Sequence, residues 1–229
     1  MRGGGWGEGM SAREKILARI RKAQGRGGSR PSQAELEAVE TYLRAHPRGT
    51  LPQVEPDLVA RFRARAEATQ CTTDEVATDG DAPAAVARYL RTNNLPLAGS
   101  VWPQLAHLDW KGAGLALEPR GAKDSDPVGV TGAFAAIAET GTLVLASGPG
   151  TPATVSLLPE THIAIVPAAR IVAHMEDAWA LARAEFRQLP RAINFVSGPS
   201  RTADIDQTIV LGAHGPYRVH LVLVRQAKG

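Results

Sequence analysis

The chain has 229 residues, of which 44% are apolar and 21% are charged, a composition typical of a globular protein with a sizeable core. No apolar run approaches the roughly 20 residues that a membrane helix requires, which argues against an integral membrane segment. The single cysteine, Cys71, excludes an internal disulfide, and one thiol cannot hold a zinc ion or an iron–sulfur cluster. These features predict a cytoplasmic protein.

The formal net charge of +3 is unevenly distributed. Residues 1–70 carry 13 Lys and Arg against 8 Asp and Glu, whereas residues 71–229 carry 13 against 15. A basic leading segment is found in proteins that bind nucleic acid or membrane surfaces, but it is also found in solvated, arginine-rich helices. We favour the solvated helix and expect no nucleic-acid partner.

The glycine-rich residues 1–10 predict a disordered leader. Two amphipathic helices are then expected, in "SAREKILARIRKA" and "SQAELEAVETYLRAHP", and each begins with a serine followed three residues later by glutamate, a capping box. Two short helices cannot bury a core alone. Residues 11–56 are therefore expected to form a helical arm that packs on the main domain or on a partner subunit, including a second copy of the chain.

Residues 57–229 predict a single α/β domain. Helices are expected over 57–69 and in "DAPAAVARYLRTNN", and short apolar strands over 70–76, in "LPLAGSVW" and in "AGLALEP". This alternation indicates a parallel sheet covered on both faces.

The character of the sequence then changes. "GVTGAFAAIAETGTLVLAS" predicts two strands around a tight turn at "ETGT", where Gly141 supplies the positive φ. A buried strand is expected in "THIAIVPAARIV" and another strand in "AINFVS". Between these two strands, "MEDAWALARAEFRQL" predicts an amphipathic helix, with an inner stripe of Met175, Trp179, Ala182 and Phe186.

Two polar loops follow predicted strands, the position at which open α/β sheets bind ligands. In "SGPSRTADID", Gly198 permits a sharp turn, and Ser200 and Thr202 are suited to cap a short helical turn with free backbone N–H groups. Arg201 adds a fork that suits a carboxylate or phosphate. An anion cradle and a plain capped turn, with Arg201 neutralised by Asp204 or Asp206, both fit the residues.

Further candidate residues lie in "LGAHGP" and "LLPETH". Gly212 and Gly215 allow the backbone or a ligand to come close to His214, which is either a general acid or base or an ordinary hydrogen-bonded loop residue. Glu160 is either a proton acceptor or a cap of backbone groups. The sequence has no P-loop, and it has no nucleophile elbow of the kind that hydrolases use. It also lacks the histidine spacing of a metal site, so no metal site is expected.

The stretches "GVTGAFAAIAETGTLVL", "LLPETHIAIV" and "SGPSRTADIDQTIVLGAHGP" together resemble the LUD-domain family, in its lactate-utilisation protein C branch. The resemblance covers roughly residues 50–226, and an alanine of "AFAAIA" stands where the family usually has an acidic residue. It implies a Rossmann-like three-layer α/β/α sandwich of the NagB/RpiA/CoA-transferase-like superfamily. It also implies a role in oxidising L-lactate to pyruvate with two iron–sulfur partner proteins. Iron–sulfur clusters are then expected in those partners, since the single cysteine of this chain cannot hold one, and a cofactor of the chain itself is left open.

Three hypotheses follow. In the first, the chain is a subunit of a lactate-oxidising system and binds a small carboxylate between the "SGPSRTADID" and "GTLVLASGPGTP" loops, near Thr142. His214 or Glu160 then accepts the proton of the substrate hydroxyl. In the second, the chain is an independent enzyme of the same fold, with acyl, phosphate-ester or formyl-folate cyclo-ligase-like chemistry. In the third, it is a non-catalytic, anion-binding scaffold.

Overall fold

The computed structural model describes residues 11–25, 30–205 and 208–226, and it describes only the backbone between 203 and 211. The predicted leader, residues 1–10, lies outside the described residues. The chain divides into two compact units, Met1–Thr50 and Leu51–Gly229. No helix in the described ranges is long and apolar enough to cross a membrane.

The first unit contains two helices, α1 (Ala12–Ala23) and α2 (Gln33–Ala45). Both predicted capping boxes are present. The Ser11 backbone N–H donates to the Glu14 carboxylate at 2.7 Å, and the Glu14 N–H donates to Ser11 Oγ at 3.3 Å. Ser32 and Glu35 repeat this exchange at 2.8 and 3.3 Å. Two of the N–H groups that each helix start leaves unpaired are satisfied in this way.

The second unit alternates helices and strands as the sequence predicts. Its first half contains α3 Leu58–Ala68, β1 Thr72–Thr78, η1 Asp79–Asp81, α4 Ala82–Thr92, β2 Ala98–Val101, η2 Pro103–Leu105, β3 Ala116–Pro119, β4 Val128–Thr131, β5 Ala135–Ile137 and β6 Thr142–Ala146. Its second half contains α5 Thr154–Leu157, β7 Thr161–Pro167, η3 Ala168–Arg170, β8 Ile171–Val172, α6 Met175–Glu185, β9 Ile193–Val196, β10 Arg201–Ile205, β11 Thr208–Leu211 and β12 Arg218–Gln226.

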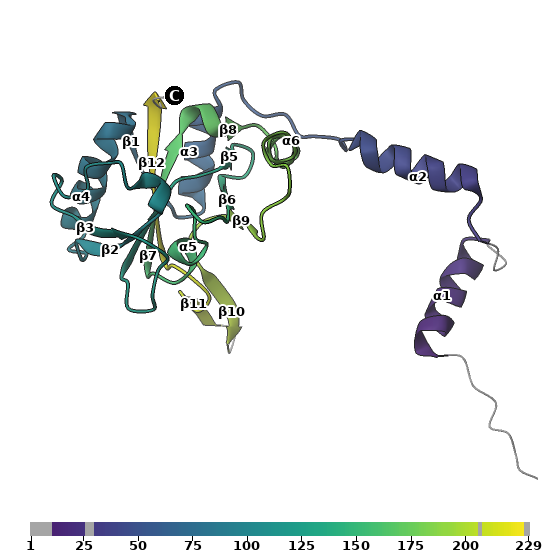
Figure 1. The fold of residues 1–229 in the computed structure, drawn as a ribbon. Helices are drawn as coiled ribbons and strands as arrows, with labels where there is room; N and C mark the ends of the chain where they lie inside the picture. The colour runs from purple at the N-terminus through teal and green to yellow at the C-terminus, as the bar shows by residue number, and fades with distance from the viewer. Residues whose placement is uncertain (1–10, 26–29, 206–207, 227–229) are drawn as a thin grey trace, which may run out of the picture. The chain divides into compact units, whose positions relative to one another are not determined.

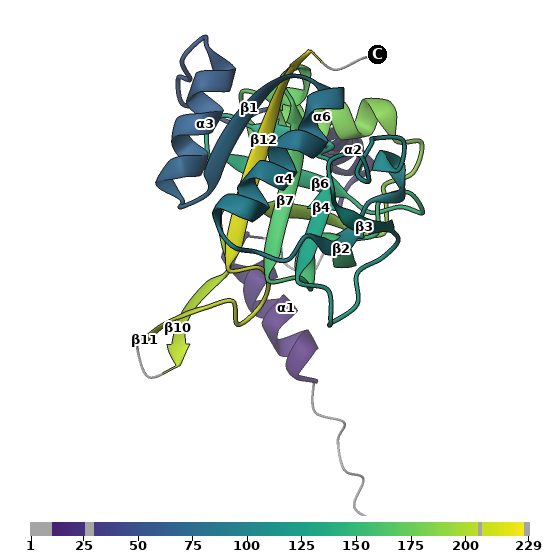
Figure 2. The same ribbon diagram turned by 90° about the vertical axis from the view of Figure 1, so that its left-hand side faces the viewer.

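Six strands form an entirely parallel sheet in the order β1-β12-β7-β4-β2-β3. The central strands read as nearly continuous apolar runs because both of their faces are buried. Helix α4 lies over one face of this sheet (Figure 2), where its residues pack with Val101, Val130, Ile163 and Val222. The prediction of an α/β fold with a parallel sheet is confirmed.

The other face of the parallel sheet is covered partly by a second sheet, of order β8-β5-β6-β9, together with α3 and α5 (Figure 1). Ala136, Leu143 and Leu145 of this smaller sheet pack with Ala164 and with other residues of the parallel sheet. Helix α6 packs on the outer face of the smaller sheet. The sequence did not predict this second sheet, which takes a position that helices occupy in a simple three-layer sandwich.

The "ETGT" turn joins β5 to β6 as an antiparallel hairpin, and Gly141 has the predicted positive φ of +69°. A Cβ at Gly141 would lie 2.4 Å from the backbone nitrogen of Ala66, so the turn also packs closely against α3. The prediction of only two strands around this turn was incomplete, because Val128–Thr131 forms a third strand, β4, in the other sheet.

Of the four residues predicted to form the inner stripe of α6, only Ala182 is buried, whereas Trp179 and Phe186 are half-buried. Ala182 is buried, as expected, but Met175 is 43% exposed and Ala178 is buried in its place. Met175 is the first residue of the helix. The buried stripe of the helix therefore begins at Ala178, about one turn after Met175.

Candidate functional site

A cavity of about 790 Å³ lies at the carboxyl ends of the parallel strands. We call it the carboxyl-end pocket. Its described lining residues are Asp79, Trp102, Pro103, Gln104, Leu105, His107, Leu108, Gly132, Ala133, Phe134, Ala146, Ser147, Gly148, Pro149, Gly150, Thr151, Ile165, Pro167, Arg170, Glu185 and Phe186. Cavities of about 300–1,000 Å³ are the usual size of small-molecule sites.

The topology of the sheet explains why the pocket forms here. Asp79, Trp102 and Gly132 directly follow β1, β2 and β4, and Pro167 is the last residue of β7. Because all of these strands are parallel, their carboxyl ends meet at one edge of the sheet, and the chain leaves that edge in loops. The "GPGTP" loop that follows β6 completes the wall.

Two hydrogen bonds to backbone carbonyls hold this glycine-rich loop in place. The indole N–H of Trp102 donates to the Pro152 carbonyl at 3.0 Å, and the Gln104 N–H donates to the Gly150 carbonyl at 3.0 Å. Trp102 is only 3% exposed, so its ring is fixed by packing as well as by this hydrogen bond. The loop is therefore a positioned wall of the pocket.

One wall of the pocket is aromatic and carries a neutralised charge. The rings of Phe134 and Phe186 lie 4.8 Å apart between centroids, and the Arg170 guanidinium lies over Phe134 at 5.1 Å. Glu185 accepts two hydrogen bonds from Arg170, at 2.6 and 2.8 Å, and these bonds hold the pKa of the Glu185 carboxyl below its usual value. The Arg170 guanidinium is therefore paired with the Glu185 carboxylate.

Several polar side chains of the pocket remain available for a ligand, among them Ser147, His107 and Asp79. The Ser147 hydroxyl oxygen accepts from the Ala192 N–H, which leaves its own O–H proton free to donate. His107 Nδ1 lies 3.1 Å from the Gln104 carbonyl oxygen. A carbonyl can only accept, so the proton resides on Nδ1 and the neutral imidazole keeps a lone pair on Nε2. Asp79 adds a carboxylate at the pocket edge.

The predicted loop "SGPSRTADID" does not form a capped helical turn. Arg201–Ile205 is a strand, β10, which pairs antiparallel with β11, and this expectation was therefore wrong. The backbone of Ser200 is already used, since its N–H donates to the Pro216 carbonyl and its carbonyl accepts from the Gly212 N–H. The Ser200 N–H therefore bonds to the backbone of another segment and is not a free donor at the start of a helix.

Arg201 has a structural partner. Its guanidinium donates to the Thr69 carbonyl at 2.8 Å, beside the carboxyl end of α3, where a positive charge complements the helix dipole. Gly198, with φ +76°, packs against the same residue, because a Cβ there would lie 2.5 Å from the Thr69 oxygen. Both residues thus join the hairpin to α3, and their predicted role toward a ligand stays a prediction.

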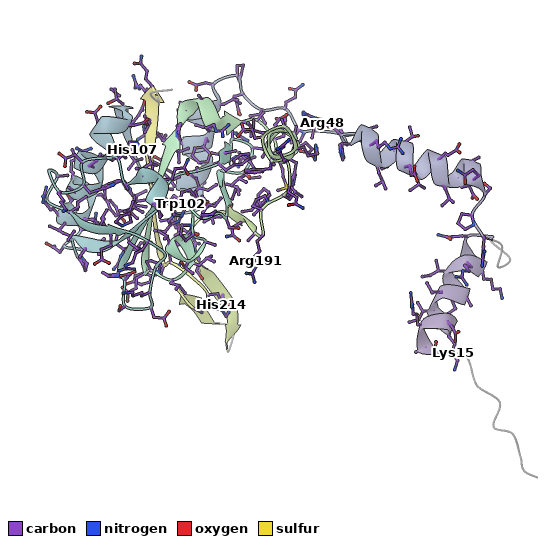
Figure 3. All side chains as sticks on the ribbon, in the orientation of Figure 1. Lys15, Arg48, Trp102, His107, Arg191 and His214 are labelled. Carbon is purple, nitrogen blue, oxygen red and sulfur yellow. The ribbon has the colours of Figure 1, made fainter. Side chains whose placement is uncertain are left out.

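The predicted residues His214, Gly212 and Gly215 lie near Ser200. The backbone N–H of His214 is 3.3 Å from Ser200 Oγ, and a Cβ at Gly215 would lie 3.7 Å from Ser200 Cβ. The imidazole of His214 is exposed, beside the β10–β11 hairpin (Figure 3). Thr202 belongs to β10, whereas the side chain of Asp204 lies outside the described part of the chain.

Glu160 lies at the same end of the sheet, directly before β7. Its carboxylate accepts a 2.6 Å hydrogen bond from the Tyr217 hydroxyl, which raises the pKa of that phenol. Its backbone carbonyl accepts from the N–H groups of Tyr217 and Arg218, where β12 begins. Glu160, His214 and Ser200 therefore gather at the amino ends of β7 and β12.

The predicted cleft between the "SGPSRTADID" and "GTLVLASGPGTP" loops is not formed. Strands β6 and β9 are antiparallel, with Leu143 opposite Val196 and Ala146 opposite Ile193. The loop after β6 and the loop after β9 consequently leave opposite ends of this pair. Thr142 illustrates the arrangement, because its buried hydroxyl lies 3.0 Å from Ser197 Oγ, at the end away from the glycine-rich loop.

Sequence reasoning missed most of the carboxyl-end pocket. Trp102, His107 and Phe134 were not singled out, although Trp102 is the last residue of a predicted strand. Figure 3 shows Trp102 and His107 well separated from His214. Ligands of open α/β sheets bind beyond the carboxyl ends of the parallel strands. The predicted site lies after β6 and β9, but these strands belong to the smaller sheet. The order of the parallel strands cannot be read from the sequence. No group of three or more potential metal ligands is found among the described side chains.

The structure is an α/β domain with a cavity at the carboxyl ends of its parallel strands. Residues 120–224 match the family model of the LUD domain. Lactate utilization protein C of Exiguobacterium sp. AT1b is 46% identical over 100 residues, which cover 42% of this chain and 44% of that protein. Lactate utilization protein C of Bacillus licheniformis is 34% identical over 158 residues, which cover 66% of each.

The crystal structure of a DUF162 family protein from Deinococcus radiodurans has a similar fold, with a TM-score of 0.58 and 23% identity over 76% of this chain and 100% of that chain. This chain belongs to the LUD-domain family, in the branch of the lactate utilization C proteins. The match to the Exiguobacterium protein spans less than half of that relative's length.

Proposed function

We propose that this chain is a subunit of an L-lactate utilisation system that oxidises L-lactate to pyruvate together with iron–sulfur partner proteins. The observation that carries the proposal is the similarity to proteins named lactate utilization protein C, at 46% identity over 100 residues and 34% identity over 158 residues. The conversion removes two electrons and two protons from the substrate. The single cysteine of the chain cannot ligate a cluster, so the electrons must leave to another centre.

The proposed site of the small carboxylate is the carboxyl-end pocket. Its position follows the general rule for parallel sheets, and it offers the Ser147 hydroxyl as a donor beside a fixed glycine-rich loop. His107 is the proposed acceptor of the substrate's hydroxyl proton, because its Nε2 keeps a lone pair. Apolar walls around these groups strengthen electrostatic interactions with a bound anion.

The alternative anion cradle at Arg201, Ser200 and Thr202 remains a proposal of lower rank. Arg201 already donates to the Thr69 carbonyl, and the loops predicted to enclose the ligand leave opposite ends of the β6–β9 pair. Catalysis by His214 or Glu160 would require the substrate to bind at the amino ends of β7 and β12. In the carboxyl-end pocket, by contrast, the proposed donor Ser147 and the proposed acceptor His107 line one cavity.

The proposal is tested by deleting the gene in its source organism and measuring growth on single carbon sources. Growth on L-lactate should be lost and growth on pyruvate retained. Complementation with Gly150→Leu should fail: a Cβ at Gly150 meets Gln104 at 3.8 Å without strain, and the longer side chain narrows the pocket. The matched control Ala84→Leu, on the exposed face of α4, should restore growth. Undiminished growth of the deletion strain on L-lactate would refute the proposed role.

A further inference from the structure

A second, smaller cavity of about 390 Å³ lies between the carboxyl-terminal half of α3 and the β5–β6 turn. We call it the arginine pocket. Its described lining residues are Pro52, Gln53, Arg61, Arg65, Ala68, Thr69, Glu139 and Thr140. It shares no described lining residue with the carboxyl-end pocket.

Two guanidinium groups face this cavity from one side of α3. Arg61 and Arg65 are four residues apart, and residues at this spacing lie on the same face of a helix. Two like charges held side by side on one wall repel each other. A bound anion would relieve that repulsion, as it does in many oxyanion sites.

Neither arginine is fully satisfied by the protein. Arg61 contacts Glu55 at 3.0 Å, but the Glu55 side chain is 62% exposed, so solvent screens this ion pair. The Nε of Arg61 is buried and lacks a hydrogen-bond partner within the described residues. Arg65 likewise makes no ion pair with a described side chain. The guanidinium of Arg65, which lines the cavity, is therefore available to a bound anion.

The carboxylate that lines the cavity is already engaged elsewhere. The Glu139 carboxylate forms a 2.9 Å hydrogen bond with Nδ1 of His174. Among the described ion pairs, none joins Glu139 to Arg61 or Arg65. The hydroxyl of Thr140, on the same turn, lies 2.7 Å from Thr142 Oγ1, and either of these oxygens can be the donor. Thr140 therefore adds a neutral polar group that can turn toward a ligand.

We propose that the arginine pocket binds a small oxyanion, either a carboxylate such as L-lactate or inorganic phosphate. Both present the planar or tetrahedral oxygens that a guanidinium fork recognises, and both fit a cavity at the lower end of the usual size range. The anion lies between Arg61, Arg65 and the Thr140 hydroxyl. Because it holds the β5–β6 turn against α3, binding also stabilises the second unit against unfolding.

Isothermal titration calorimetry on the full-length chain at low ionic strength tests this site, with inorganic phosphate in one series and L-lactate in another. Arg65→Gln keeps a polar side chain on an exposed helix position and removes the charge. The matched control is Arg63→Gln on the same helix, because Arg63 pairs with Glu67 and does not line the pocket. Equal thermal melts of both variants without ligand confirm that each is folded.

One of the two anions should bind the wild type, and Arg65→Gln should weaken its affinity by about tenfold or more, with Arg63→Gln within about twofold of wild type. Binding of phosphate alone assigns the site to phosphate, and binding of L-lactate assigns it to the carboxylate. Absence of binding for both anions overturns the inference, as does an equal loss in the two variants, which would indicate diffuse surface charge. Gly150→Leu separates the two pockets, because it should leave affinity at the arginine pocket unchanged.

Discussion

Two buried histidines should make the stability of the second unit fall steeply as the pH is lowered from 7 to 4.5. His162 is 0% exposed and His220 is 3% exposed. Burial lowers the pKa of each imidazole from the ordinary 6.5 to about 4. Each ring makes one hydrogen bond, to Thr131 Oγ1 and Thr72 Oγ1 respectively, both at 2.8 Å. The other ring nitrogen of each has no partner among the described groups, so a second proton there would be buried and unpaired.

The sign and the magnitude follow from linkage. The unfolded chain takes up a proton on each histidine near pH 6.5, whereas the folded chain resists protonation until about pH 4. Stability is therefore fully present above pH 6.5 and is lost as the pH falls toward 4. A pKa that falls from 6.5 to about 4 corresponds to about 3 kcal/mol per group, most of which is lost by pH 4.5. Together the two groups cost about 5 kcal/mol, comparable with the total stability of many domains.

Urea unfolding followed by far-UV circular dichroism at pH 7, 6, 5 and 4.5 measures this loss. His220→Gln should lower stability at pH 7, because the ring stacks on Tyr89 at 3.8 Å, but it should halve the dependence on pH. His46→Asn, at an exposed position, should leave the dependence unchanged. Paired carboxyls such as Asp126, whose pKa the Arg120 hydrogen bonds lower, act mainly at or below their unfolded value of about 3.9. Equal stability at pH 7 and 4.5 would refute the reasoning.

Three further predictions concern packing and domain structure. Gly141→Ala should destabilise the second unit by about 2 kcal/mol or more in urea unfolding, because the residue has φ +69° and its new Cβ would lie 2.4 Å from Ala66 N; a loss under 0.5 kcal/mol would show that the turn can shift. Arg201→Ala should cost about 1 kcal/mol through the lost hydrogen bond to Thr69, and calorimetry with L-lactate should be unaffected unless the loop binds the anion as first predicted. Removal of residues 1–47 should leave a cooperatively unfolding domain that associates less well with partner proteins, since all three apolar clusters lie in the second unit; a molten product would instead make the arm part of the core.

Local features of the fold were predictable because they depend on neighbouring residues. A serine followed by glutamate three positions later defines the starts of α1 and α2 through backbone chemistry alone. Gly141 likewise marks a turn whose φ few other residues adopt. The apolar run that becomes β7 indicates a buried strand.

The candidate site was not predictable to the same degree, because it depends on which strands become neighbours. "AINFVS" indicates a strand but not its direction, and the antiparallel pairing of β9 with β6 separates the two loops that were expected to meet. Asp79, Trp102 and Gly132 come together only because β1, β2 and β4 are parallel. In the same way, nothing in the local sequence relates Glu139 to His174, 35 residues away.

The most direct test of the account is an L-lactate-dependent dye-reduction assay on the purified chain mixed with its iron–sulfur partner proteins. Activity should require the complete mixture, should be lost with Gly150→Leu and should be retained with Ala84→Leu. Turnover by the chain alone would instead identify an independent enzyme. Equal activity of the partner proteins with and without the chain would contradict the proposal that the chain is a working subunit of the system.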